Sequence, residues 1–227
     1  MLELNDIALK VGDFDLSANL SIAGPGVTAV IGPSGGGKST LLSLIAGFQM
    51  PDKGRLFWNG TDITDLSPGA RPVAMLFQDN NLFPHLDSLT NVALGAAPVA
   101  HPSSETKERA RDALKRVGLA GLESRKPGGL SGGQQSRVAL ARLLLTNRPI
   151  ILMDEPFSAL GPSQRQEMLA LIKELLPAAT ILMVTHDPDD ARDTKQTVVI
   201  SNGFVSPPRE TTALFADPPA ALHAYLR

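Results

Sequence analysis

The chain has 227 residues, enough to bury a sizeable core as one large domain or as a core with a small lobe. Hydrophobic residues make up 43% and charged residues 19%, and the formal net charge of -2 leaves no basic excess for binding nucleic acid. The absence of cysteine excludes disulfides and cysteine metal sites, and no apolar run approaches the roughly 18 residues that a membrane helix needs. We therefore expect a protein without a secretory signal that works at a membrane, if at all, through a partner.

Alternating apolar residues characterise two stretches of the N-terminal part. The alternation runs through roughly the first 25 residues and returns between Arg55 and Ile63, where Asn59-Gly60 marks a tight turn. A strand with one buried face alternates in this way because successive side chains point to opposite faces. The sequence therefore predicts an antiparallel sheet in this region.

Three short apolar runs, residues 28–31, 150–153 and 181–184, are continuous rather than alternating. Runs of this length are typical of parallel strands that are covered on both faces. The first run leads through a glycine-rich loop into residues 38–46, where apolar residues follow a helical spacing and Gly47 is a plausible stop. The pattern predicts a strand, a loop and a helix in succession.

The loop between that strand and that helix carries a phosphate-binding pattern. Residues 32–39 read Gly-x-x-x-x-Gly-Lys-Ser, in which glycines let backbone N–H groups turn inward toward an anion at the positive end of the helix. We expect Lys38 to reach the β- and γ-phosphates of a nucleotide and the Ser39 hydroxyl to bind Mg²⁺. The predicted nucleotide-binding residues are Gly32, Pro33, Ser34, Gly35, Gly36, Gly37, Lys38, Ser39 and Thr40.

Residues 82–125 are rich in Ala, Leu and charged residues, with a Pro/Gly interruption near residues 98–102. This composition predicts an inserted helical lobe. Roughly the last 20 residues, which include two Pro-Pro pairs, predict a short tail rather than another domain.

Residues 130–134 read Leu-Ser-Gly-Gly-Gln and have the chemistry of a helix start. Ser131 can cap the helix, and Gly132 and Gly133 expose backbone N–H groups at its positive end, next to Gln134. A second anion site in a chain that already has one needs a reason. Either it binds an unrelated anion, or it completes the nucleotide site of another copy.

The strand at residues 150–153 ends in two adjacent carboxylates, Asp154 and Glu155. Beside a phosphate loop, we expect Asp154 to hold Mg²⁺ and Glu155 to act as the general base on the attacking water. Alternation along the strand would send the two side chains to opposite sides, which supports this division of roles.

The segment 130–134, with residues 32–40 before it and residues 150–156 after it, resembles the ATP-binding subunits of ABC transporters over essentially the whole chain. The resemblance implies an α/β fold, with a P-loop NTPase core on a mainly parallel sheet, an antiparallel β subdomain and an inserted helical subdomain. It implies a core over residues 1–80 and 145–227 and a helical subdomain over residues 81–144. It also implies a head-to-tail dimer that binds ATP and Mg²⁺, in which the segment 130–134 of one copy covers the γ-phosphate held by the other.

Single positions follow from the same resemblance. Gln78 is similar to a glutamine that senses Mg²⁺ and the attacking water, and His186 to a histidine that contacts the γ-phosphate. The usual aromatic residue near position 11 is missing, so either Phe14 stacks on adenine or Val11 makes a weaker apolar contact. Gly161 stands where the family usually has an aspartate that spans the dimer interface.

Residues 71–86, together with residues 1–7, are similar to the ATP-binding subunits of bacterial thiamine importers. Polyamine, iron(III) and sulfate importers have similar cassettes. This resemblance implies permease subunits, a periplasmic substrate-binding protein and a peripheral position on the cytoplasmic face of the inner membrane. Residues 80–86 would border the groove that receives the permease, or would pack inside the helical lobe. The rival functions are a non-transport ATP switch, for instance on nucleic acid, and an ordinary P-loop kinase or GTPase.

Overall fold

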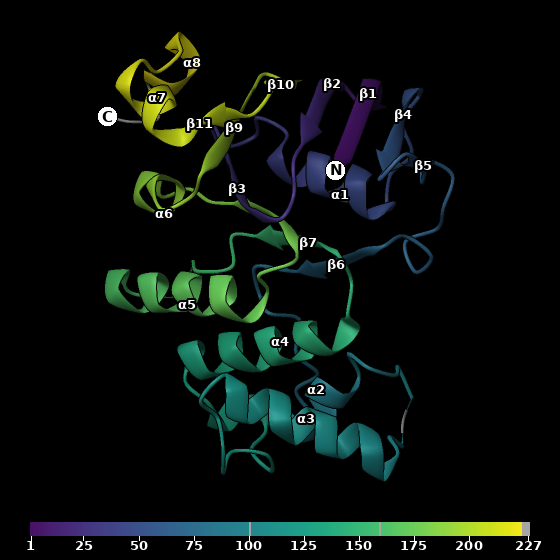
Figure 1. The fold of residues 1–227 in the computed structure, drawn as a ribbon, viewed down its shortest axis with the longest axis vertical. Coiled ribbons are helices and arrows are strands. Elements are labelled where there is room, and N and C mark those ends of the chain that lie inside the picture. Colours follow the sequence, from purple (N-terminus) through teal and green to yellow (C-terminus); the bar gives the residue numbers. More distant parts are fainter. Residues whose placement is uncertain (100, 159, 224–227) are drawn as a thin grey trace. The chain divides into compact units, whose positions relative to one another are not determined.

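The structure is a computed structural model that describes residues 1–99, 101–158 and 160–223. Ala100 of the expected helical subdomain, and Ala159 and residues 224–227 of the expected core, therefore lie outside the described residues. The chain forms two compact units. The core unit comprises Met1–Val73, Pro149–Glu155 and Ala178–Arg227, and the helical unit comprises Ala74–Arg148 and Pro156–Pro177. Figure 1 labels the helices and strands of both units.

The first half of the core unit is an antiparallel sheet. It contains β1 (Leu2–Val11), β2 (Phe14–Ile22), β4 (Lys53–Trp58) and β5 (Thr61–Asp62). β1 pairs with β2 on one side and with β4 on the other, with Leu4 opposite Leu20 and Leu56. Asn59 and Gly60 have φ angles of 48° and 79° and connect β4 to β5. The antiparallel sheet and its Asn-Gly turn are thus confirmed.

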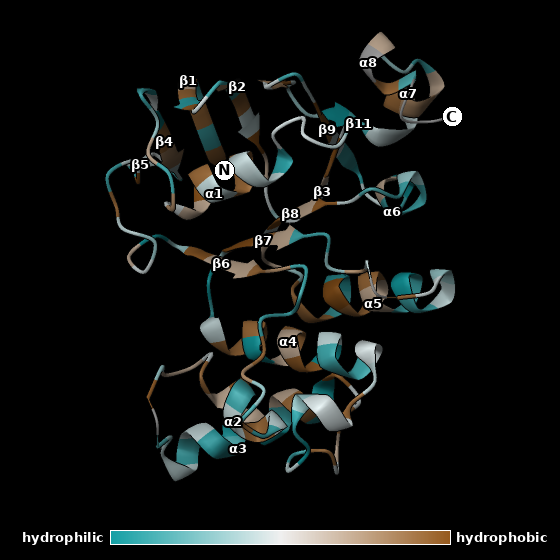
Figure 2. Cartoon of the chain, turned by 180° about the vertical axis from the view of Figure 1, so that it is seen from behind, coloured by the Kyte–Doolittle hydropathy of each residue, from teal (hydrophilic) through white to brown (hydrophobic). Residues whose placement is uncertain are grey.

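The second half of the core unit is a buried parallel sheet. β3 (Gly26–Ile31) lies between β8 (Thr180–Val184) and β9 (Gln196–Ser201), and β7 (Ile150–Asp154) pairs with β8. Residues 27–31 of β3 are all buried, as expected for a parallel strand that is covered on both faces, and Figure 2 colours most of this strand brown. All three predicted parallel strands are confirmed. Because parallel strands end at one edge of a sheet, the segments that follow β3, β7 and β8 gather there.

A short hairpin links the two sheets. β9 turns into β10 (Phe204–Val205), which pairs antiparallel with β9 and parallel with β2. The core-unit strand order is therefore β5-β4-β1-β2-β10-β9-β3-β8-β7.

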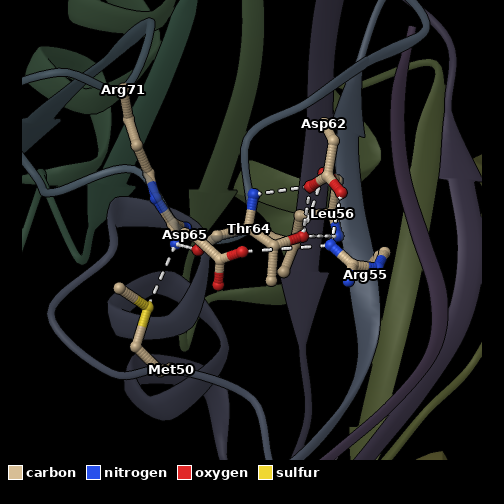
Figure 3. Close-up of polar contacts among 7 residues, drawn as sticks. All are labelled: Met50, Arg55, Leu56, Asp62, Thr64, Asp65 and Arg71. Carbon is tan, nitrogen blue, oxygen red and sulfur yellow. Dashed lines mark hydrogen bonds and ion pairs between the residues drawn. The ribbon is translucent and has the colours of Figure 1, made fainter.

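Helix α1 (Lys38–Ala46) has the bounds expected from the sequence, and Gly47 ends it with φ 86°. Arg71 holds this end of the helix: its side chain is fully buried and donates hydrogen bonds to the carbonyl oxygens of Leu44 and Ile45, at 2.7 and 2.9 Å. Figure 3 shows the same guanidinium reaching Met50 beside Thr64. A Cβ on Gly47 would lie 2.6 Å from Arg71 Nε, so the helix end also requires glycine for close approach.

The C-terminal segment is more ordered than a simple tail. After α6 (Pro188–Arg192) and β9 the chain forms β11 (Arg209–Glu210), α7 (Thr211–Ala216) and α8 (Ala220–His223). Leu214 and Leu222 are buried against Ile31 and Val199 of the parallel sheet. The described part of the tail therefore belongs to the core of this unit, because its two leucines cover the sheet.

The helical unit contains the short strand β6 (Val73–Leu76), which begins at the unit boundary, and the helices α2 (Ser88–Ala93), α3 (Ser104–Arg116), η1 (Pro127–Gly129), α4 (Gly132–Thr146) and α5 (Pro162–Leu175). Helices α2, α3 and α4 pack against one another, and α5 packs against α4. Helices α2 and α3 confirm the helical character of residues 82–125. The division into subdomains at residues 80 and 145 stays a prediction. Among the described helices, none is long and apolar enough to cross a membrane.

Candidate active site

A cavity of about 260 Å³ opens in the core unit where the parallel strands end. Its lining brings together the glycine loop, the start of α1, the carboxylate after β7 and the histidine after β8. The residues that line it are Val11, Phe14, Ser34, Gly35, Gly37, Lys38, Ser39, Thr40, Glu155 and His186. Residues that lie far apart in the sequence therefore share one site.

The glycine loop has a backbone that other residues would adopt only with strain. Gly32, Gly35 and Gly37 have φ angles of 150°, 75° and 109°. Gly37 is also the N-cap of α1 and has no side chain that could accept a hydrogen bond from the first N–H groups of the helix. The first N–H groups of α1 are therefore available to an anion, at the positive end of the helix.

Lys38 is only 6% exposed, and its ammonium donates hydrogen bonds to Gly32 O at 2.9 Å and Pro33 O at 3.0 Å. Burial lowers the pKa of Lys38, an effect that the nearby Glu155 and Asp154 carboxylates oppose. The ammonium thus ties the end of the loop to its beginning, beside two carboxylates. Its expected reach to the β- and γ-phosphates stays a prediction.

Asp154 and Ser39 form an oxygen pair beside the cavity. The Ser39 hydroxyl donates to Asp154 Oδ1 at 3.4 Å. Burial raises the pKa of Asp154, and the hydrogen bond from Ser39 opposes that rise. A hydroxyl and a partly desolvated carboxylate are ligands that Mg²⁺ accepts, so these residues fit the ion. Gln78 is an exposed residue after β6 in the helical unit, and its magnesium-sensing role stays a prediction.

Glu155 departs from the strand geometry that the sequence suggests. Its φ of 49° lies in the left-handed region, and its N–H donates to Val184 O at 3.1 Å. Strand alternation therefore does not determine the directions of the Asp154 and Glu155 side chains, because the chain leaves the strand at Glu155, and the separate roles of the two residues stay a prediction. Against the effect of its burial, both carboxylates raise the pKa of Lys38.

The Glu155 carboxylate contacts another predicted site residue, His186. Oε1 of Glu155 is in contact with Nε2 of His186. The glutamate side chain is 18% exposed and the histidine side chain 47% exposed. A carboxylate that faces the cavity and is oriented by an imidazole is suited to accept a proton from water.

Both candidates for the adenine contact line the cavity. The Phe14 ring lies on the loop: a Cβ on Gly37 would be 2.8 Å from Phe14 Cζ. Val11 is 39% exposed at the end of β1. Phe14 therefore packs against the loop, whereas Val11 offers a smaller and more open apolar surface, and the two alternatives both stand.

The segment 130–134 lies in the helical unit and begins α4, as expected from the sequence. Ser131 Oγ accepts a hydrogen bond from Gln134 N, and Gln134 Oε1 accepts one from Ser131 N, which forms a capping box. Gly132 and Gly133 lie between the two residues of this capping box, at the positive end of the helix.

One contact of the glycine loop, with the turn between β9 and β10, was not predicted from the sequence. Gly203 N–H donates to Gly36 O at 3.2 Å from the turn between β9 and β10. The dipeptide Asn202-Gly203 carries the same turn signal as Asn59-Gly60 and would have indicated a hairpin.

Comparison with known proteins places these observations in a family. The profile of the family described as ABC transporter matches residues 17–158. The chain is 54% identical to Thiamine import ATP-binding protein ThiQ of Cereibacter sphaeroides over 229 aligned residues, covering 100% of this chain and 99% of the relative. It is 52% identical to the protein of the same name from Ruegeria sp. (strain TM1040), again covering 100% and 99%.

Among solved structures, the dimeric structure of MJ0796, a bacterial ABC transporter cassette, has a TM-score of 0.80 at 32% identity, covering 93% of this chain and 99% of that one. A second cassette, MJ1267 in its ADP conformation, has a TM-score of 0.85 at 26% identity, covering 100% and 98%. These matches confirm the expected resemblance and the α/β fold class with its P-loop core. The chain therefore belongs to the ABC transporter family, as an ATP-binding cassette.

Proposed function

We propose that this chain is the ATP-binding and ATP-hydrolysing subunit of a thiamine importer. The observation that carries the proposal is the 54% identity, over the whole chain, to a protein named Thiamine import ATP-binding protein ThiQ. Polyamines, iron(III) and sulfate are the alternative solutes, because their importers have similar cassettes.

In this proposal the glycine loop and Lys38 bind the phosphates of ATP. The uncapped N–H groups of α1 and the buried ammonium supply positive charge on one side of the cavity. Ser39 and Asp154 would hold Mg²⁺, with Gln78 as the predicted third contact, and the ion would neutralise charge on the phosphates. Phe14 or Val11 would contact the adenine.

Hydrolysis would depend on Glu155 and His186. Glu155 would accept the proton of the attacking water, and the contact with His186 would orient the carboxylate toward the γ-phosphate. The left-handed backbone at Glu155 turns the carboxylate toward the cavity rather than along the strand, which supports this role.

The working form in this proposal is a head-to-tail dimer. The match to a cassette solved as a dimer supports it. The N-terminus of α4, from Ser131 to Gln134, would cover the γ-phosphate bound by the second copy. The dimer would drive permease subunits from the cytoplasmic face of the inner membrane, and a periplasmic binding protein would deliver the solute.

Uptake of labelled thiamine tests the proposal. A bacterial strain that lacks its own thiamine-import cassette should regain uptake when this chain is expressed with its permease and binding protein. Lys38→Ala should abolish the gain. Excess unlabelled thiamine should compete, whereas a polyamine, iron(III) or sulfate should not. Restoration of polyamine, iron(III) or sulfate uptake in place of thiamine would contradict the substrate assignment.

A further inference from the structure

The turn between β9 and β10 lies against the glycine loop. Asn202 and Gly203 have φ angles of 48° and 76°, the left-handed values of a tight hairpin turn. The N–H of Gly203 donates to Gly36 O at 3.2 Å, and the carbonyl of Gly203 accepts from Ser17 N at 2.8 Å. One residue of the turn thus joins the loop to strand β2.

The hairpin contacts the glycine loop at a second place. A Cβ on Gly32 would overlap the carbonyl oxygen of Ile200, and a Cβ on Gly36 would lie 3.3 Å from the same oxygen. Ile200 is the residue of β9 that pairs with Val205 of β10. The start and the middle of the loop therefore both rest on the β9–β10 hairpin.

This contact determines the orientation of one peptide group in the loop. A trans peptide is planar, so its C=O and the following N–H point in opposite directions. Because Gly36 O points toward Gly203, the N–H of Gly37 points away from the hairpin. Gly37 lines the cavity, whereas the cavity lining includes neither Gly36 nor Gly203. The Gly37 N–H therefore points away from the hairpin, at a residue that lines the cavity.

We propose that the Asn202-Gly203 turn is a positioning element for nucleotide binding, because the N–H of Gly203 holds the Gly36–Gly37 peptide with its N–H toward the phosphates. This inference depends on the proposed binding of ATP at the loop. Only glycine suits the position, since its φ is 76° and a Cβ there would overlap the carbonyl oxygen of Asp15.

The chain offers a matched control for this element. Gly60 occupies the same place in the Asn59-Gly60 turn, with φ 79°, and a Cβ there would meet no atom within 4 Å. Gly60→Ala imposes a similar left-handed backbone strain, but without the overlap with Asp15 that Gly203→Ala adds. Within the described residues, no backbone hydrogen bond joins the Asn59-Gly60 turn to the glycine loop.

The experiment measures the affinity of purified wild type, Gly203→Ala and Gly60→Ala for MgATP and MgADP by titration calorimetry. It also measures the thermal midpoint of each variant without nucleotide. We expect Gly203→Ala to weaken both affinities by about 10- to 100-fold, because a misplaced backbone donor no longer faces a phosphate. Gly60→Ala should stay within about twofold of wild type, because its turn is remote from the loop.

The nucleotide affinity shows whether the turn positions the loop for binding. A turn that only stabilises the fold would change the thermal midpoint and leave the affinity unchanged. Because a methyl group at position 203 would also crowd Asp15 and Phe14, a second variant carries one glycine inserted after Asn202, which displaces the donor without adding a side chain. A glycine inserted after Asn59 is its control, and this pair also serves if Gly203→Ala does not fold. Unchanged affinity in the folded Gly203 or Asn202 variant, or equal losses in the variant and its control, would overturn the inference. Failure of the wild type to bind ATP would overturn both the inference and the proposed function.

Discussion

Replacement of Arg71 by methionine tests how the phosphate-binding helix is anchored. The Arg71 side chain is 0% exposed, and its guanidinium forms hydrogen bonds with backbone carbonyls of two separate segments, the end of α1 and the loop after β5. The acceptors are the carbonyl oxygens of Leu44, Ile45, Thr64 and Leu66, at distances of 2.5–3.0 Å. Methionine fills similar apolar volume but donates no hydrogen bond, so these oxygens would lose their charged donor.

The expected loss of stability follows from those contacts. A buried acceptor that loses its partner costs about 1–3 kcal/mol, but partial relaxation and entry of water reduce the sum over several carbonyls. With four backbone carbonyls losing a donor and part of that cost recovered by relaxation, we expect Arg71→Met to lose about 3–5 kcal/mol. At about 2–4 °C per kcal/mol for a domain of this size, the thermal midpoint should fall by about 6–20 °C.

Urea unfolding followed by far-UV circular dichroism measures the loss, with Arg55→Met as the control. Arg55 is 59% exposed and pairs with Asp62 at the surface, so its removal should cost less than about 1 kcal/mol. A loss for Arg71→Met that is no greater than the loss for Arg55→Met would refute the view that the buried guanidinium anchors α1.

Three further outcomes are expected. Lys38→Ala should weaken MgATP binding at least about tenfold in a calorimetric titration, because it removes the buried positive charge that we propose contacts the phosphates; unchanged affinity would contradict this role. Hydrogen bonds from Thr64 lower the pKa of Asp62 from 3.8 to about 2, so its stabilisation is present above pH 3.8 and disappears as the pH falls through about 2. The denaturation midpoint of Asp62→Ala should therefore lie below that of wild type at pH 6 and approach it near pH 2; a constant difference would argue against the linkage. Gly161 is the N-cap of α5 without a side-chain hydrogen bond, and a Cβ there meets no atom within 4 Å. Gly161→Asp should thus add about 0.5 kcal/mol of stability in thermal melts, whereas Gly161→Ala should add none; equal midpoints for the two variants would exclude capping.

Much of the core unit could be predicted because local signals and the fold agree there. The apolar run before the glycine loop, the loop itself and Gly47 together delimit α1, and the structure has the same bounds. The Asn59-Gly60 turn is a local signal of the same kind. Each depends on residues that are close in sequence, so no knowledge of distant segments is needed.

The features that the sequence analysis missed depend on distant segments or on a local departure from regular geometry. The burial of Arg71 arises only when the C-terminal end of α1 and the loop at Thr64 come together around it. The left-handed backbone of Glu155 ends a strand whose alternation seemed to continue. The role of Leu214 in the core depends on a helix of six residues, too short to give a clear periodicity.

Within the candidate site, the sequence identified the loop, Glu155 and His186, and the structure places them around one cavity. It did not indicate the contact between Glu155 and His186, because side chains from two different strand ends meet only in the folded sheet.

Thiamine-dependent ATP hydrolysis by the assembled importer tests the central claim most directly. The chain, reconstituted in proteoliposomes with its permease and loaded binding protein, should hydrolyse ATP faster when thiamine is present. Glu155→Gln should lower that rate by about 10²- to 10⁴-fold while ATP binding is retained, because the proposed general base is lost and the residues proposed to bind the phosphates remain. Hydrolysis that does not respond to thiamine, or that continues at the wild-type rate in Glu155→Gln, would contradict the proposed function.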